Sequence, residues 1–182
     1  MTADVLADFL EQPHNGVIAT LRADGLPYTV PVWWLWDPDP SAPTFTAGRH
    51  EYPGGSLWLT GTTGRVWCRQ LRADPRASLC IESGPPMVGH VGFDGPCESL
   101  VADSVDIWPV TRRLVEKYVG RNDPANTGGV EAFYANMQTE PRMLFRMRPR
   151  VMRAIDMRVY RGKRADQQPA TFGHVLPGSG NI

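Results

Sequence analysis

Short stretches of alternating or apolar residues, separated by turn-forming residues, run through most of the chain. This pattern predicts β-strands over residues 17–21, 28–36, 57–60, 77–82, 87–101, 143–147 and 151–157, with a brief further strand at 44–47 inside a long loop over 37–56. Asp24-Gly25 predicts a hairpin turn after the first strand, and Asp94-Gly95 predicts another within 87–101. Pro31 cannot donate to a neighbouring strand, so the second strand is expected at a sheet edge or a bulge.

Helical periodicity is confined to short segments. Residues 3–12 place Val5, Leu6, Phe9 and Leu10 on one face, and helices are also expected over 65–73, 110–119 and 130–138. Many strands with few helices predict a mainly β (α+β) protein, a small antiparallel barrel with peripheral helices. We expect this domain to span residues 1–160, followed by a tail over 161–182 that is rich in Gly, Pro and polar residues.

Composition narrows the class of protein. The 182 residues include 19 basic and 19 acidic side chains, and this zero net charge argues against a dedicated nucleic-acid binder. The 18 glycines and 17 prolines are too many for a bundle of long helices. No apolar run approaches the length of a membrane span and the three cysteines form no C-x-x-C pair, so a cytoplasmic protein is expected. The four histidines lack ligand spacing, and no metal site is predicted.

The stretch LWLTGTTGRVWCRQLRADPR (57–76) is the most informative for chemistry. A strand leads into a Gly/Thr turn and then into a helix whose first turn holds Arg65. Free amides at a helix start, hydroxyls and a guanidinium together suit an anion such as a phosphate. The same pattern also fits a threonine that only caps the helix.

Three tryptophans occur within PYTVPVWWLW (27–36). They form either a flat wall for an aromatic ligand or part of the core. Trp33 and Trp34 point to opposite faces of a regular strand, so they do not share one role. Separately, residues 142–164 hold nine basic side chains and only one acid, which indicates either an anion-binding segment or a solvated surface.

The order of these pieces resembles a known family. The series is G-V-I-A-T-L (16–21), D-G-x-P (24–27), V-P-V-W (30–33), L-W-L-T (57–60) and R-x-L-R-x-D-P-R (69–76). It is similar to the pyridoxamine-phosphate-oxidase-like split β-barrels, which include FMN enzymes and reductases that use the deazaflavin coenzyme F-420. The resemblance covers roughly residues 3–157.

The resemblance implies a six-stranded antiparallel split β-barrel that forms a homodimer, with the cofactor in a groove shared by two subunits. It places the cofactor ring along Val30, Pro31, Val32 and Trp33. It places the phosphate at the strand–turn–helix segment, with Thr60, Thr62, Thr63, Gly64, Arg65, Val66 and Trp67 as the implied contacts.

Departures from the oxidase pattern restrict the activity. The charged residues that the oxidase carries at the positions of Val30 and Leu35 are absent, and so is its C-terminal R-x-H-D-R. The common lysine of the helix segment is Trp67 here, so the phosphate is expected to rely on Arg65 or another arginine. These differences argue against oxidation of pyridoxamine phosphate.

The leading hypothesis is an oxidoreductase that uses coenzyme F-420 to reduce a small-molecule substrate. The excess of arginine over 142–164 suits the polyanionic oligoglutamyl tail of that cofactor. The alternatives are an FMN-dependent enzyme and a non-catalytic barrel that binds a flavin or a tetrapyrrole, where His50 or His90 would serve as the axial ligand of a haem. The residue pattern identifies neither the substrate nor a catalytic residue.

Overall fold

Ten strands and four α-helices make up the described part of the chain. The computed structural model describes residues 1–47, 50–85, 88–101, 104–121 and 123–160. The helices are α1 (Ala3–Glu11), α2 (Val66–Ala73), α3 (Trp108–Tyr118) and α4 (Thr127–Gln138), with 3-10 turns at Pro124–Asn126 and Met157–Tyr160. The strands are β1 (Gly16–Leu21), β2 (Pro27–Val32), β3 (Leu35–Pro38), β4 (Phe45–Ala47), β5 (His50–Tyr52), β6 (Gly55–Thr62), β7 (Arg76–Ser83), β8 (Gly89–Val101), β9 (Arg142–Met147) and β10 (Val151–Asp156). Within these ranges no helix has the length and apolar character needed to cross a membrane.

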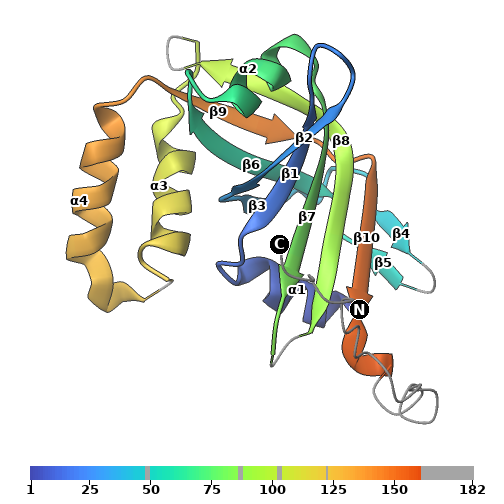
Figure 1. Cartoon of the computed structure of the whole chain (residues 1–182). Coiled ribbons are helices and arrows are strands. Elements are labelled where there is room, and N and C mark those ends of the chain that lie inside the picture. Colours follow the sequence, from blue (N-terminus) through green and yellow to red (C-terminus); the bar gives the residue numbers. More distant parts are fainter. Residues whose placement is uncertain (48–49, 86–87, 102–103, 122, 161–182) are drawn as a thin grey trace, which may run out of the picture.

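The main sheet is antiparallel and curls into a barrel (Figure 1). Its strand order is β2-β1-β7-β8-β9-β6-β3, and β10 also pairs with β8. The two outer strands of this order, β2 and β3, are consecutive in the chain and only Trp33 and Trp34 separate them. The mainly β fold class is therefore confirmed, and so is the edge position expected for the strand that contains Pro31.

The hairpin predicted at Asp94-Gly95 is wrong. Strand β8 runs without interruption from Gly89 to Val101, pairing with β7 and β10 in its first half and with β9 in its second. Gly95 serves a close backbone contact, because a Cβ atom there would lie 2.5 Å from the carbonyl oxygen of Arg148. Among the described glycines, only Gly25 has a positive φ (81°), as expected for the first hairpin turn.

Other boundaries differ by shorter stretches. The strand predicted over 28–36 is divided into β2 and β3, and the loop predicted over 37–56 contains the β4–β5 hairpin. Helix α4 begins at Thr127, three residues earlier than predicted. The predicted tail over 161–182 lies outside the described residues.

The barrel interior holds the main hydrophobic core. Ile18, Leu57, Phe93 and Phe145 are fully buried there, together with apolar side chains of α1 and α2. The opposite face of β6 and β9 is covered by α3, whose Leu114 packs with Leu144 in a second cluster. Alternation of side chains along each strand thus supplies two cores, one on each face of β6 and β9.

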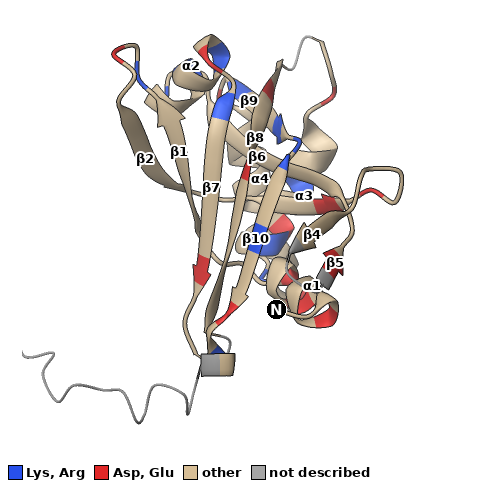
Figure 2. Cartoon of the chain, turned by 90° about the vertical axis from the view of Figure 1, so that its right-hand side faces the viewer, with Lys and Arg blue, Asp and Glu red and all other residues tan. Residues whose placement is uncertain are grey.

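One face of the sheet is covered by none of the helices in the described part of the chain. In Figure 2 the strands β1, β7, β8 and β10 face the viewer with nothing in front of them and with few charged residues. The pairing registers align one row across this face: Pro31, Val17, Cys80, Gly92 and Arg153. Val17 and Cys80 are exposed, so this row is a largely uncharged surface open to solvent.

Candidate functional site

A cavity of about 330 Å³ lies where the β2–β3 link, β6, β9, α2 and α4 meet. Its lining residues are Asn15, Pro31, Val32, Trp33, Thr60, Gly61, Arg65, Trp67, Phe133, Met137 and Arg142. The structure therefore brings together the two sequence segments that the family resemblance had singled out, although they are about thirty residues apart in the chain.

Six of the eleven residues implied as cofactor contacts line this cavity: Pro31, Val32, Trp33, Thr60, Arg65 and Trp67. The other five are absent from its lining: Val30, Thr62, Thr63, Gly64 and Val66. Several polar groups of the turn already have partners within the protein. The Thr63 amide donates to the Pro141 carbonyl (2.9 Å), and the Thr60 hydroxyl donates to the Met143 carbonyl (3.0 Å). The single hydroxyl proton of Thr60 is therefore used within the protein, and this hydroxyl is not the free donor expected for an anion cradle.

Two arginines give the cavity a basic wall. Arg65 precedes α2, and Arg142 begins β9 opposite Thr62 of β6. The Arg142 side chain is only 12% exposed, and its Nη2 donates to Glu140 (2.5 Å). Its Nε is buried and has no partner within the described residues. Arg142 itself lines the cavity, so its guanidinium adds positive charge to this wall.

The two guanidinium charges converge near Cys68, in the first turn of α2. Burial raises the pKa of the Cys68 thiol to about 12, and the positive charges of Arg65 and Arg142 oppose that rise. Within the described residues no side chain caps α2, so the amides of its first turn also keep their donor capacity. Arg65, Arg142 and the start of α2 therefore lie together beside the cavity, an arrangement of the kind that suits an anion.

Trp67 forms the floor of the cavity. The side chain is 3% exposed and its ring contacts Phe145, with 5.1 Å between ring centroids. It lies across Gly61 of β6, where a Cβ atom would come within 2.5 Å of the indole. The family resemblance places a lysine at this position, whereas the present chain has a buried indole here and Arg142 of β9 in the cavity lining.

The opposite wall is aromatic. Trp33 stacks on Tyr118 of α3 with 4.9 Å between centroids and 5° between planes. Tyr118 is itself fixed, because its hydroxyl donates to the His14 carbonyl (2.8 Å) and accepts from the Trp34 amide (3.2 Å). Trp34 is fully buried, so the structure assigns Trp34 to the core and Trp33 to the cavity wall.

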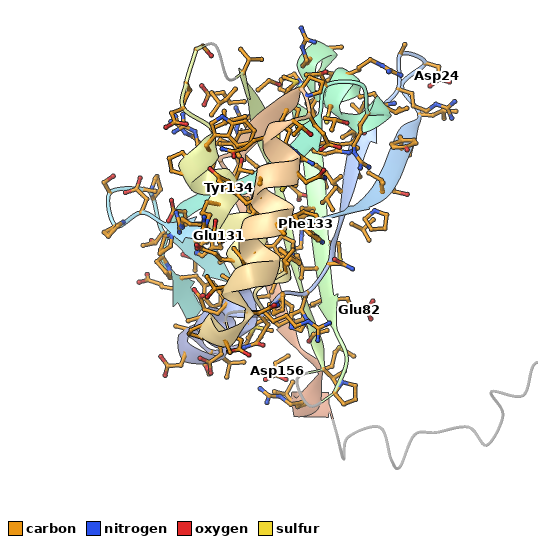
Figure 3. All side chains as sticks on the ribbon, turned by 90° about the vertical axis from the view of Figure 1, so that its left-hand side faces the viewer. Asp24, Glu82, Glu131, Phe133, Tyr134 and Asp156 are labelled. Atoms are coloured by element: carbon orange, nitrogen blue, oxygen red, sulfur yellow. The ribbon has the colours of Figure 1, made fainter. Side chains whose placement is uncertain are left out.

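Sequence reasoning missed the contributions of α4 and β9. Phe133 and Met137 of α4 line the cavity, and the Phe133 ring lies 5.5 Å from Trp33. Figure 3 places Phe133 on the side of α4 opposite to Glu131 and Tyr134. Arg142 is part of the basic run over 142–164. Only the pairing of β9 with β6 distinguishes it from the other arginines of that run, because this pairing places Arg142 at the cavity.

The remaining basic side chains of that run are partly neutralised. Arg146 pairs with Glu98 (2.6 Å) and Arg158 pairs with Asp156 (2.7 Å). In one regular strand, Arg146, Arg148 and Arg150 would all point to the same face. Strand β9 ends at Met147, however, so Arg148 and Arg150 lie beyond it. Together with Arg146 they nevertheless line a second cavity of about 620 Å³ beside Gly55 and Ser56.

Comparisons with known proteins agree with this architecture. A family model described as pyridoxamine 5'-phosphate oxidase matches residues 2–156. Similar solved structures include a conserved hypothetical protein from Mycobacterium tuberculosis (22% identity, TM-score 0.57, covering 98% of this chain and 94% of that one). An F-420 reductase (21%, 0.53, 80% and 94%) and the heme storage protein HutZ from Vibrio cholerae (15%, 0.53, 86% and 95%) share the fold as well. No curated protein sequence is significantly similar to the chain.

At these sequence identities the solved structures show a shared fold and nothing about function. The family model, by contrast, matches nearly all of the described chain. Together with the antiparallel barrel and the cavity beside α2, this match shows that the chain belongs to the pyridoxamine 5'-phosphate oxidase family of flavin-binding split barrels.

Proposed function

We propose that the chain is an oxidoreductase that binds a phosphorylated flavin or deazaflavin in the 330 Å³ cavity. The observation that carries this proposal is the basic wall, where Arg65 and Arg142 line one space beside the start of α2, which has no side-chain cap within the described residues. Two guanidiniums offer the charge-assisted hydrogen bonds that a phosphate accepts. The bound cofactor supplies the hydride chemistry, and the protein orients it and shields it from water.

Between the possible cofactors, we favour coenzyme F-420 over FMN. The 620 Å³ cavity is lined by Arg146, Arg148 and Arg150 and offers a place for a polyanionic tail. The likeness to an F-420 reductase supports the same choice at the level of the fold. The haem alternative has less support, since the described lining of the 330 Å³ cavity contains no histidine and His90 lies on the open sheet face, opposite Ile155.

We also propose a homodimer in which the open sheet face of one subunit packs on a second copy. The family resemblance implies a cofactor groove shared by two subunits. Pro31 belongs both to the row across this face and to the lining of the cavity, so a partner seated there would border the cofactor. Exposed apolar side chains such as Val17 and Val151 give this face the character of an interface.

The test is a titration of F-420 and of FMN against the wild type, Arg65→Ala and Arg142→Ala. Loss of one charge-assisted contact should cost about 1.5–3 kcal/mol, which is a weakening of about 10- to 150-fold. Arg113→Ala is the matched control, because Arg113 of α3 pairs with Asp37 (3.0 Å) and lies outside both the cavity lining and the open sheet face. Unchanged dissociation constants in both cavity variants would remove the assignment. The absorbance spectrum of the purified protein adds an independent identification, since flavin, deazaflavin and haem have distinct bands.

A further inference from the structure

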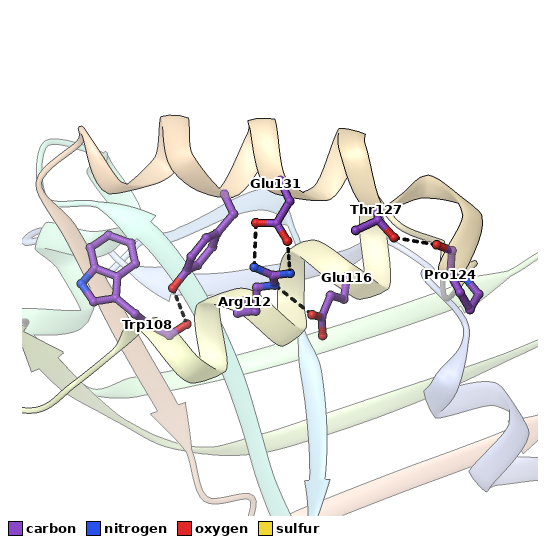
Figure 4. A network of polar contacts seen from close by, with 7 residues as sticks. Trp108, Arg112, Glu116, Pro124, Thr127 and Glu131 are labelled. Atoms are coloured by element: carbon purple, nitrogen blue, oxygen red, sulfur yellow. Dashed lines mark hydrogen bonds and ion pairs between the residues drawn. The ribbon is translucent and has the colours of Figure 1, made fainter.

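Helix α4 packs mainly on α3. Arg112 of α3 donates to Glu131 of α4 (Nη1 to Oε2, 3.0 Å) and to Glu116 of its own helix (2.9 Å), as Figure 4 shows. Beneath these charges, Val115 of α3 packs with Val130 and Met137 of α4 in a small buried cluster. These contacts fix the position of α4 beside the barrel.

Of the two aromatic side chains of α4, Phe133 is the one on the side away from Tyr134 (Figure 3). The next residue, Tyr134, turns toward α3, with Arg112 5.2 Å from its ring and its hydroxyl donating to the Trp108 carbonyl (3.4 Å). A helix rotates about 100° per residue, so Phe133 points away from α3 and toward the cavity. It lies there against Trp33 with 38% of its surface exposed.

The cavity consequently has two chemically different sides. Arg65 and Arg142 form the basic side, whereas Trp33, Phe133 and Met137 form an apolar side with Asn15 as its polar neighbour. Within the described lining, the apolar side carries no charged residue. Tyr118 fixes the plane of Trp33, and the buried Met137 fixes α4 against α3, so both parts of the apolar side are held in place.

We propose that Trp33 and Phe133 select the substrate of the cofactor-dependent reaction, and that this substrate is a planar, uncharged ring compound. The inference rests on the proposed function, in which the cofactor phosphate occupies the basic side and the cofactor ring lies along Pro31 and Val32, so that Trp33 borders both the ring and the substrate. Two aromatic rings at 5.5 Å favour a flat partner by stacking and edge contacts. A charged compound would lose hydration against this wall and gain no opposite charge in return.

The experiment is isothermal titration calorimetry of the cofactor-saturated protein with two probes that share one ring system. These are neutral 2-naphthol and anionic naphthalene-2-sulfonate. The wild type should bind 2-naphthol at least about tenfold more tightly than the sulfonate. Phe133→Ala should weaken 2-naphthol about five- to tenfold and change the cofactor dissociation constant by less than about twofold.

Controls separate selection by Phe133 from a general effect of the substitution. Phe133 is partly exposed, so Phe133→Ala is expected to fold normally, and its melting temperature is measured alongside. Leu26→Ala removes an exposed apolar side chain (57%) outside the cavity lining and should leave 2-naphthol binding unchanged.

Each other outcome has a definite meaning. The proposal is overturned if the sulfonate binds more tightly than 2-naphthol, or if Phe133→Ala leaves the affinity for 2-naphthol unchanged. Neither result affects the proposed function. A parallel loss of cofactor affinity in Phe133→Ala overturns it too, since Phe133 would then be part of the cofactor site. If neither cofactor binds to the wild type, the proposed function fails and this inference falls with it.

Discussion

Replacement of Lys117 by methionine should change how the stability of the protein depends on pH. Lys117 lies in α3 and is only 3% exposed. Its Nζ donates to the Leu10 carbonyl at the end of α1 (2.7 Å) and lies 3.5 Å from the centroid of the Trp34 ring. Burial lowers the pKa of this amine to about 7, although the charge of Glu11 acts in the opposite direction.

The magnitude follows from proton linkage. The pKa of an unfolded lysine is about 10.5, so between pH 7 and 10.5 the unfolded chain binds more protons at this site than the folded chain. The free energy of unfolding therefore rises with pH in this window, by at most about 1.4 kcal/mol per pH unit. Below pH 7 both states are protonated and the contribution of Lys117 to the slope disappears. From pH 7 to pH 9 the expected gain is about 2 kcal/mol.

Urea denaturation of the wild type and Lys117→Met at pH 7, 8 and 9 measures this gain directly. The variant lacks the titrating amine, so the difference in unfolding free energy, wild type minus variant, should grow by about 2 kcal/mol from pH 7 to pH 9. The chain has only two lysines, and Lys163 is present in both proteins, so its titration cancels in the difference. Parallel pH curves would refute the reasoning. They would mean that the Leu10 carbonyl and the Trp34 ring stabilise the buried ammonium enough to keep it charged.

Three further predictions concern packing, cofactor choice and assembly. Gly61→Ala should destabilise the protein by about 1–3 kcal/mol in urea denaturation, because its Cβ would meet Trp67 at 2.5 Å. Gly84→Ala, where none of the described atoms lies within 4 Å of the new Cβ, is the control, and equal losses would contradict the packing argument. If F-420 is the cofactor and its tail lies among the arginines of the 620 Å³ cavity, the affinity for F-420 should fall more steeply with added salt than the affinity for FMN. Tighter binding of FMN at every salt concentration would identify FMN as the cofactor. Light scattering at micromolar concentration should give about twice the 20.2 kDa mass of one chain and the monomer mass for Val17→Asp, whereas a wild-type monomer would argue against the dimer.

Local signals predicted the parts of the fold that depend on neighbours in sequence. The Asp24-Gly25 turn and the short amphipathic helix α1 are set by conformational preference and periodicity within a few residues. The same kind of signal failed at Asp94-Gly95, because tertiary pairing with three strands outweighs a two-residue turn preference. A glycine required for close backbone approach and a glycine required for positive φ look alike in a sequence.

In the candidate site, too, local sequence signals predicted some residues, whereas others depend on tertiary packing. Trp33, Thr60 and Arg65 belong to motifs that order and spacing make visible. Arg142 enters the cavity only because β9 pairs with β6, about eighty residues earlier in the chain, and nothing local distinguishes it from the other arginines nearby. Phe133 reaches the cavity through the position of α4 on α3, which is a matter of helix packing and not of pattern.

The pairing of β6 with β9 also affects how the protein forms during synthesis. Strand β6 leaves the ribosome early, but the strand that covers one of its edges begins at Arg142. Closing so long a loop is slow, and until then the nascent chain presents an unsatisfied strand edge and exposed apolar side chains. The barrel therefore cannot close before most of the chain has been made, and the growing polypeptide should depend on chaperones that bind apolar segments until β9 emerges.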